Sequence, residues 1–197
     1  MELIEDERKL DRMGIPPVFR AASFAKIPDD CPHKEVVLKF AGDIEDHVRK
    51  GYGLLMYGEN SRGKTALSTM LLRCLPKGMW GLFVVSEKIP KYIIERTEFD
   101  PYEKYIDRMR SVDLLVLDEI VIHNTDTFRD TCIESVLRDR VMDQKSTIIT
   151  TNWTPDRLRK EYSSMYEVLR EAVLPVQVEG HNFRSERAGK MMGDILK

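Results

Sequence analysis

Short segments rich in apolar residues alternate along the chain with segments in which apolar residues recur every three or four positions. We predict strands in the first kind of segment and helices in the second. The expected strands are 53–57, 80–86, 112–117, 147–151 and 174–178. Because short apolar strands separated by helices are typical of a parallel sheet covered on both faces, the pattern predicts an α/β fold.

The helical periodicity fills the intervals between these strands. Gly51 is placed to end the first of the expected helices, and Thr125 or Thr127 is available as the N-cap of the fourth. The expected helices are 36–48, 66–75, 89–96, 128–141 and a basic stretch that follows Pro155.

Composition and charge narrow the class of protein. The 197 residues are enough for one domain with a core, since 42% are hydrophobic and 32% charged. The formal net charge of −2 excludes a generally basic nucleic-acid-binding protein but not local basic patches.

No apolar run approaches the ~20 residues of a membrane span, and the acidic start of the chain is unlike a secretory signal. Cys31, Cys74 and Cys132 are too scattered for a disulfide framework or a zinc site. We therefore expect a soluble cytoplasmic protein with reduced thiols.

The most specific motif is the segment 58–65, Gly-Glu-Asn-Ser-Arg-Gly-Lys-Thr, which fits the phosphate-loop pattern G-x-x-x-x-G-K-[ST]. It lies between an expected strand and an expected helix, where backbone N–H groups converge on phosphate oxygens and the helix N-terminus adds positive charge. Lys64 is expected to reach the β- and γ-phosphates, and the Thr65 hydroxyl to bind Mg²⁺. The residues predicted to bind the nucleotide are Gly58, Glu59, Asn60, Ser61, Arg62, Gly63, Lys64, Thr65 and Ala66.

Polar residues end two of the later strands. Asp118 is expected to hold Mg²⁺ at the carboxyl edge of the sheet, where open α/β sheets bind ligands. Glu119 can polarise an attacking water, which favours hydrolysis of the γ-phosphate. Asn152 is placed to contact both the γ-phosphate and that water, an interaction lost with the diphosphate. All three also fit ordinary turn positions. The predicted catalytic residues are Glu119, Lys64 and Asn152, and the predicted metal ligands are Thr65 and Asp118.

Together with segments near both ends of the chain, these motifs resemble the DnaC/IstB-type AAA+ ATPases, which include bacterial and phage replicative-helicase loaders. The resemblance covers roughly residues 14 to 190. It begins with Gly-Ile-Pro-Pro-Val-Phe-Arg-Ala-Ala-Ser-Phe at 14–24, continues through the phosphate loop, 113–120 and 150–152, and ends with Gly-His-Asn-Phe-Arg-Ser-Glu-Arg at 180–187. The two Walker elements are shared by a large superfamily, so the terminal segments are what point to this branch.

The resemblance implies a five-stranded parallel sheet in AAA+ order, with a minimal lid domain or none, and ATP and Mg²⁺ as ligands. It implies a hexameric, DnaB-like replicative helicase as partner, with single-stranded DNA and further copies of the chain as additional partners. The setting would be a bacterial or phage-infected cell. Residues 1–13 are expected to form a short charged segment, 14–190 the AAA+ domain and 191–197 a tail.

The sequence departs from the family in two places. Loaders usually carry an N-terminal helicase-binding domain, and here about thirteen residues precede Gly14, so docking is expected to use that segment or another surface. The family also carries an arginine, after the strand that ends at Asn152, that reaches the γ-phosphate of a neighbouring subunit. The corresponding stretch 162–167 holds no arginine. We therefore expect slow hydrolysis by the protein alone, or dependence on a partner's arginine. The nearby candidates are Arg157, Arg159 and Arg170.

Several basic and aromatic residues are candidates for nucleic-acid contact. Trp153 is placed to stack a base, although core packing explains it as well. Phe24 fits adenine packing and a core position equally, and the four histidines have no metal-binding spacing. The basic candidates, which also fit solvated helix faces, are Arg157, Arg159 and Lys160, then Arg184, Arg187 and Lys190, and finally Lys88 and Lys91 beside Tyr92.

Three functions stay open at this point. The first is a DnaC-type helicase loader that acts in DNA replication. The second is an IstB-like transposition ATPase that assembles on duplex DNA. The third is an adaptor or helicase inhibitor that binds ATP with little hydrolysis. A small-molecule kinase is disfavoured by Glu119 and by the lack of an arginine-rich lid between the motifs.

Overall fold

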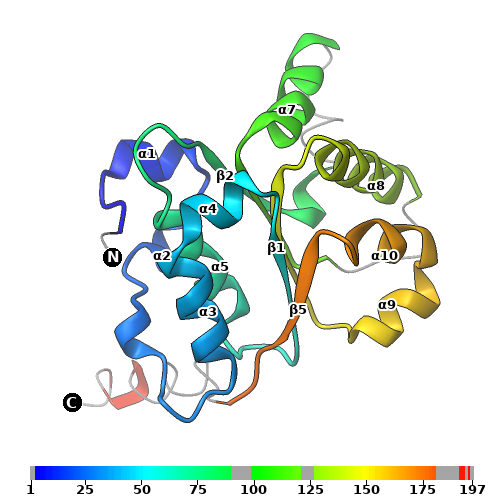
Figure 1. The fold of residues 1–197 in the computed structure, drawn as a ribbon. Coiled ribbons are helices and arrows are strands. Elements are labelled where there is room, and N and C mark those ends of the chain that lie inside the picture. Colours follow the sequence, from blue (N-terminus) through cyan, green and yellow to red (C-terminus); the bar gives the residue numbers. More distant parts are fainter. Residues whose placement is uncertain (1–2, 90–98, 121–126, 181–190, 194, 196–197) are drawn as a thin grey trace.

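The computed structural model of the chain describes residues 3–89, 99–120, 127–180, 191–193 and 195. At its centre lies a five-stranded parallel sheet with the strand order β2-β3-β4-β1-β5 (Figure 1). The predicted α/β fold is therefore confirmed, and the strand ends differ from prediction by at most two residues. The strands are β1 (Gly53–Tyr57), β2 (Gly81–Val85), β3 (Leu114–Asp118), β4 (Ser146–Thr151) and β5 (Val173–Gln177).

The strand order determines which loops meet at the carboxyl edge of the sheet. β4 lies between β1 and β3, with Ile148 opposite both Leu54 of β1 and Val116 of β3. Because all three strands run in the same direction, the segments that follow them leave the sheet side by side. These are the segments that carry the phosphate loop, the two carboxylates and Asn152.

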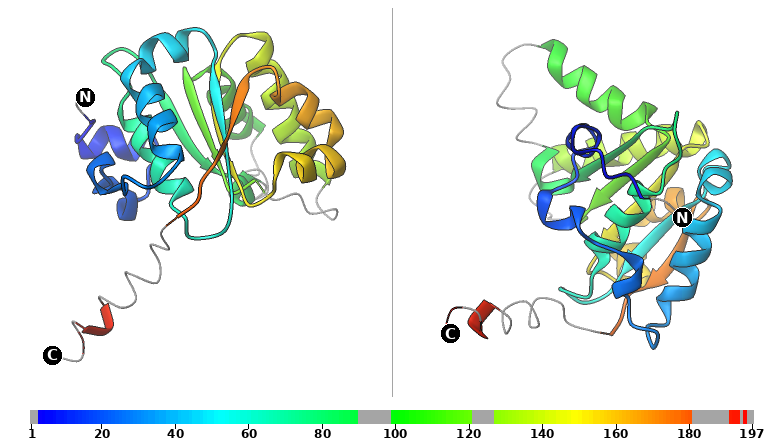
Figure 2. Two further views of the ribbon diagram at one scale, coloured as in Figure 1. Left: turned by 60° about the horizontal axis from the view of Figure 1, so that its bottom comes forward. Right: turned by 90° about the vertical axis from the view of Figure 1, so that its left-hand side faces the viewer.

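Helices cover both faces of the sheet, as the two views in Figure 2 show. The layer with α3, α4 and α5 packs on one face, and α8, α9 and α10 lie on the other (Figure 1). The helices are α1 (Glu7–Arg12), α2 (Pro17–Arg20), α3 (His33–Gly42), α4 (Ile44–Arg49), α5 (Lys64–Arg73), α7 (Phe99–Ser111), α8 (Thr127–Met142), α9 (Pro155–Glu161) and α10 (Ser163–Leu169), with short 3₁₀ helices η1 (Phe24–Lys26) and η2 (Ser86–Lys88).

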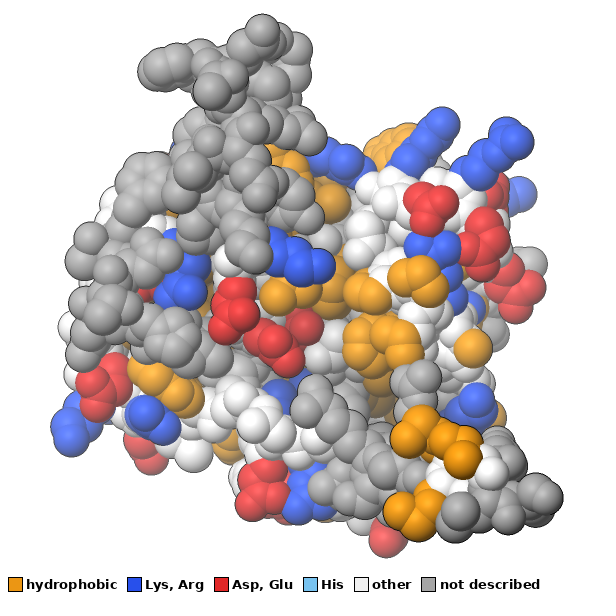
Figure 3. All heavy atoms as spheres, turned by 180° about the vertical axis from the view of Figure 1, so that it is seen from behind, with side chains coloured by type: hydrophobic (Ala, Val, Ile, Leu, Met, Phe, Trp, Pro, Cys, Tyr) orange, Lys and Arg blue, Asp and Glu red, His pale blue; other side chains and the backbone are white. Residues whose placement is uncertain are grey.

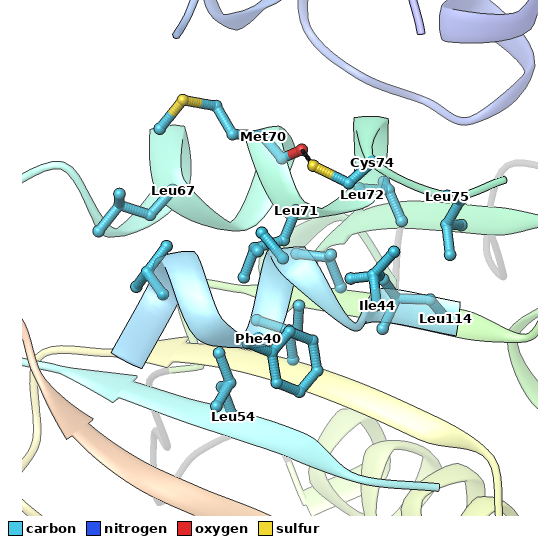
Figure 4. Packing of buried hydrophobic residues seen from close by; sticks show 14 of the residues in the cluster. Phe40, Ile44, Leu54, Leu67, Met70, Leu71, Leu72, Cys74, Leu75 and Leu114 are labelled. Carbon is cyan, nitrogen blue, oxygen red and sulfur yellow. Dashed lines mark hydrogen bonds between the residues drawn. The ribbon is translucent and has the colours of Figure 1, made fainter. Parts of the chain in front are cut away.

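The helix that begins at the phosphate loop is anchored by a tight apolar core. Figure 4 shows Leu71 of α5 and Phe40 of α3 packed above Leu54 and Leu114 of the sheet. Each of these side chains is at most 6% exposed, and burial of a side chain of this size stabilises a fold by about 1.5–3 kcal/mol. α5 is therefore held rigidly against the strands whose ends carry the polar motifs.

One helix prediction needs correction, one helix of the structure was not predicted, and one prediction lies outside the described residues. The helix expected over 36–48 is two helices, because the chain leaves helical geometry at Asp43, with φ −113° and ψ 33°. Gly42 and Asp43 are both weak helix formers, which explains the break at this point. α7 was not predicted. The helix expected over 89–96 falls almost entirely outside the described residues, as does Thr125, whereas Thr127 is the first residue of α8.

The charged N-terminal segment packs against the sheet. Leu10 and Met13 are both 1% exposed and belong to the α5-side core. The Met13 carbonyl accepts a hydrogen bond from Phe83 N at 2.7 Å, so the segment covers part of the outer edge of β2, the last strand of the sheet. None of the helices in the described ranges combines the length and the apolar character that a bilayer crossing requires.

Candidate nucleotide-binding site

The loop between β1 and α5 has the strained backbone that its glycines permit. Gly58 and Gly63 have φ of 140° and 95°, values that favour glycine. A Cβ on Gly58 would lie 2.5 Å from the Val178 carbonyl oxygen, so no larger residue fits there. Gly63 immediately precedes the first turn of α5. The loop therefore ends at a helix N-terminus, the arrangement that binds phosphate groups.

Lys64 and Asn152 meet across this loop. The Lys64 ammonium donates to the carbonyls of Gly58 and Glu59, both at 2.7 Å, and to Asn152 Oδ1 at 2.9 Å. The lysine is 8% exposed, and these three contacts are to neutral oxygen atoms. A phosphate group entering the loop would offer this ammonium charged oxygen acceptors in their place, which make stronger hydrogen bonds.

Thr65 and Asp118 also lie together. The Thr65 hydroxyl donates to Asp118 Oδ2 at 3.2 Å, and the Thr150 hydroxyl donates to Asp118 Oδ1 at 2.7 Å. Asp118 is 3% exposed. Burial raises the pKa of its carboxyl to about 6, although both hydroxyl contacts act in the opposite direction. A hydroxyl and a carboxylate are the oxygen ligands that Mg²⁺ prefers, so the pair fits a magnesium ion.

The backbone of Glu119 is fixed while its side chain is exposed. Glu119 has φ 56°, an uncommon value for this residue type. Its N–H donates to Thr150 Oγ1 at 2.9 Å, and its carbonyl accepts from Ser86 Oγ at 2.6 Å. Hydrogen bonds with Thr150 of β4 and Ser86 of η2 thus stabilise a strained turn that presents the carboxylate to the cavity described next.

A single cavity of about 420 Å³ brings Lys64, Thr65, Glu119 and Asn152 together with a second, more apolar wall. Asp118 does not line the cavity, but its hydrogen-bond partners Thr65 and Thr150 do. The phosphate loop, Glu119 and Asn152 line one part, and residues of 18–33 line the other. Phe24 does not line it: it is 9% exposed and belongs to the core, so the core interpretation is favoured over adenine packing. The lining includes Asn60, Ser61, Arg62, Gly63, Lys64, Thr65 and Ala66, seven of the nine predicted binding residues.

His33 and Glu179 are among the cavity residues that had no predicted role. His33 is 5% exposed, and its Nδ1 has no hydrogen-bond partner among the described residues. Burial lowers the pKa of this histidine, and the charge of Glu179, which also lines the cavity, opposes the shift. His33 precedes the phosphate loop by 25 positions and Glu179 follows β5, so no short motif connects them.

Gly58 and Glu59 line a second hollow, of about 430 Å³, beside the end of β5. Arg62 reaches across the loop, donating to the Gly180 carbonyl at 2.5 Å and pairing with the Glu59 carboxylate at 2.5 Å. The arginine therefore ties the phosphate loop to the segment that leaves the sheet, a contact that the motif alone does not predict.

The candidate nucleic-acid contacts are only partly placed. Arg157, Arg159 and Lys160 are exposed on α9. The Arg157 guanidinium lies 4.2 Å from the centre of the Trp153 ring, which packs against the core on the α8 side, so one face of the indole is already occupied. The face in Figure 3 shows acidic and basic side chains interspersed rather than a continuous basic stripe. Lys88 is exposed, and the candidates outside the described residues are Lys91, Tyr92, Arg184, Arg187 and Lys190.

The candidate arginines after β4 lie on two short helices. Arg170 forms an ion pair with Glu167 at 3.2 Å, and no ion pair of Arg157 or Arg159 is found within the part of the chain that the structure describes. None of these three lines the cavity. The structure thus brings no arginine of this stretch to the phosphate loop of its own chain.

Known proteins resemble the chain in sequence and in fold. No family model matches the chain. A replicative helicase loader, DnaI of Bacillus subtilis (strain 168), is 24% identical over 183 residues, which are 83% of this chain and 58% of the relative. The chain therefore spans less than two thirds of that relative's length.

Solved structures with a similar fold come from proteins of replication initiation. The structure of the DnaC helicase loader superimposes with a TM-score of 0.69 and 19% identity, covering 83% of this chain and all of the other. The replication initiator DnaA bound to AMPPCP and single-stranded DNA gives a TM-score of 0.68 and 16% identity, over 81% and 50% of the two chains. The chain thus has an α/β fold of AAA+ type, and its resemblance to the DnaC-type helicase loaders is confirmed.

Proposed function

We propose that the protein is an ATP-dependent replicative helicase loader of DnaC type. The observation that carries the proposal is the convergence of Lys64, Thr65 and Asn152 at one end of a single cavity, with Asp118 accepting a hydrogen bond from Thr65. These are the groups that an ATP-binding site needs for phosphate, metal and γ-phosphate contact. The similarity to DnaI and DnaC supports the loading role.

Each residue of the site has a proposed role. The loop N–H groups and Lys64 bind the phosphates, and Thr65 with Asp118 holds Mg²⁺, which would neutralise charge on the β- and γ-phosphates. Glu119 accepts a proton from the attacking water. Asn152 already contacts Lys64, so it can exchange that contact for the γ-phosphate when the triphosphate binds. This exchange is the proposed origin of a difference between the ATP and ADP states.

Hydrolysis by the isolated protein should be slow. No arginine of the stretch after β4 lines the cavity, and an arginine supplied in trans contributes roughly 10³–10⁵ in rate in enzymes that use one. We propose that a neighbouring copy or the helicase supplies it. The partner would be a hexameric, DnaB-like helicase, with single-stranded DNA as a second ligand, in the cytoplasm of a bacterial or phage-infected cell.

The test is loading itself. Purified protein, the helicase of the same genome and circular single-stranded DNA are mixed with ATP, with ADP or with no nucleotide, and helicase bound to the circle is measured after gel filtration. Loading with ATP that exceeds loading with ADP at least tenfold is expected. Absence of helicase binding in every nucleotide state would contradict the loader proposal.

Two alternatives would give other results. An IstB-like transposition ATPase would prefer duplex DNA and assemble along it. A helicase inhibitor or adaptor would bind ATP and the helicase without turnover above background, even with DNA present. The absence of a cavity-lining arginine in this stretch favours the second of these alternatives over the first.

A further inference from the structure

Arg73, the last residue of α5, is buried, with an exposure of 4%. Its guanidinium donates from Nε to the Ile4 carbonyl at 3.1 Å and from Nη1 to the Ala22 carbonyl at 2.9 Å. Its own carbonyl accepts from Ile4 N at 2.8 Å. A buried arginine needs acceptors for its N–H groups. Arg73 finds them in the carbonyls of Ile4 and Ala22, and so joins α5 to two separate points of the chain that precedes α3.

One of those points lies in the wall of the nucleotide cavity. Ala22 lines the cavity together with Phe19 and Ile27, and Leu67 and Met70 of α5 line it as well. This part is apolar, whereas the phosphate loop lies elsewhere in the cavity. Apolar surfaces of this kind bind the flat, uncharged parts of ligands. In a bound nucleotide that part is the base, because the phosphates require the loop.

The wall has little regular structure of its own. Ala22 lies between α2 and η1, in neither a helix nor a strand, and its N–H donates to the Phe19 carbonyl at 3.1 Å. Its carbonyl is bound by Arg73. Lys64 begins α5 and Arg73 ends it, so the two lie roughly 14 Å apart along one helix. A single rigid element therefore connects the phosphate-binding loop with the support of the apolar wall.

We propose that Arg73 is a positioning residue for the nucleotide base: its hydrogen bond to the Ala22 carbonyl holds the apolar wall against α5 at the distance that a nucleotide bound to the phosphate loop requires. This inference rests on the proposed ATP-binding function. Arg73 would then contribute to the affinity for the base and ribose, whereas the phosphate loop would determine the affinity for the phosphates.

The test compares ATP with inorganic tripolyphosphate, each with Mg²⁺, by titration calorimetry. The dissociation constant for tripolyphosphate divided by that for ATP measures what the base and ribose contribute. In Arg73→Met this ratio should fall about tenfold or more, the effect expected when hydrogen bonds from a charged donor are lost. The dissociation constant for tripolyphosphate should change less than about twofold. Arg73→Lys, which keeps a single donor group, should give an intermediate ratio and is the second variant if Arg73→Met does not fold.

Arg140→Met is the matched control. Arg140 is also a buried arginine that donates to backbone carbonyls, among them those of Met109 and Val112, both at 2.8 Å. It does not line the cavity. Loss of stability alone should therefore leave its ratio at the wild-type value. An unchanged ratio in a folded Arg73 variant, or an equal fall in Arg140→Met, would overturn the positioning role.

Hydrogen exchange on the wild-type protein tests the same inference without substitution. ATP, but not tripolyphosphate, should slow amide exchange in residues 18–28 and at Ile4, whose N–H is bound by Arg73. Equal protection by both ligands, or none by ATP, would contradict it. If neither ligand binds at all, the proposed ATP-binding function fails. If tripolyphosphate binds as tightly as ATP, the phosphate site stands and the base wall does not.

Discussion

Asp118 is a carboxylate in a buried position, and its environment favours the protonated form. It accepts hydrogen bonds from two threonine hydroxyls, and it is still only 3% exposed. Its pKa of about 6 lies above the value of 3.8 expected for an exposed aspartate. The folded protein therefore binds a proton here more readily than the unfolded chain does, and ionised Asp118 lowers the free energy of unfolding at neutral pH.

Asp118→Asn should consequently stabilise the nucleotide-free protein. At pH 7.5 the free energy of unfolding is expected to rise by about 1–3 kcal/mol. The gain should shrink as the pH falls below 6, because wild-type Asp118 is then protonated and equally uncharged. Urea unfolding of both proteins at pH 7.5 and 5 measures this. A gain in stability that is the same at both pH values would contradict the raised pKa of Asp118. If Asp118 also binds Mg²⁺, the variant should lose any dependence of ATP affinity on Mg²⁺.

Lys64 and Glu119 separate binding from turnover. Lys64→Ala should weaken ATP binding, since an ammonium that contacts phosphate contributes about 1.5–3 kcal/mol, or roughly tenfold or more in dissociation constant. Glu119→Gln should bind ATP with unchanged affinity and lose any hydrolysis, because the exposed carboxylate makes no contact that the amide cannot replace. Fluorescent ATP titration and phosphate release measure the two effects. Equal loss of binding in both variants would show that their roles are misassigned.

At the scale of elements, the amino edge of the sheet depends on one side chain. Arg140 of α8 is fully buried and donates to carbonyls that precede β3, to the Ser146 carbonyl and to Thr147 Oγ1. Arg140→Met would leave several buried carbonyls without a donor, each costing about 1–3 kcal/mol. A fall of more than about 3 kcal/mol in the free energy of unfolding is expected, measured in urea. A fall below about 1 kcal/mol would show that water replaces the guanidinium.

The sequence predicts the strands and the phosphate loop well. All five strands were recognisable, four as short segments rich in apolar residues and β4 from its β-branched residues, and the phosphate loop because its backbone geometry demands specific residues. Arg73 and Arg140 were not, because a buried arginine has the same pattern as an exposed one until its carbonyl partners are known. The cavity wall of 18–28 has no periodicity, and His33 joins the site only through the packing of α3 beside α5.

At the scale of the whole molecule, charge is mixed over the face in Figure 3, and α9 offers the one group of predicted basic residues that is fully within the described chain. If this helix binds single-stranded DNA, replacing Arg159 and Lys160 together by Glu should lower the affinity about tenfold or more at low salt and reduce its salt dependence. Fluorescence anisotropy at 50 and 200 mM salt, values at which the effect is usually large, measures this. Lys39→Glu on α3 is the control and should change neither value, and ATP affinity should stay constant.

The hydrogen bond between Met13 and Phe83 bears on where the chain can be shortened. A boundary placed at Gly14 would seem natural from the sequence, yet it would remove the acceptor of the Phe83 amide and empty the pockets that Leu10 and Met13 fill. The flank of β2 would then be open to pairing with the same strand of another molecule. A fragment starting at residue 14 should therefore form aggregates on purification, and one that stayed monodisperse by light scattering would show that this flank needs no cover.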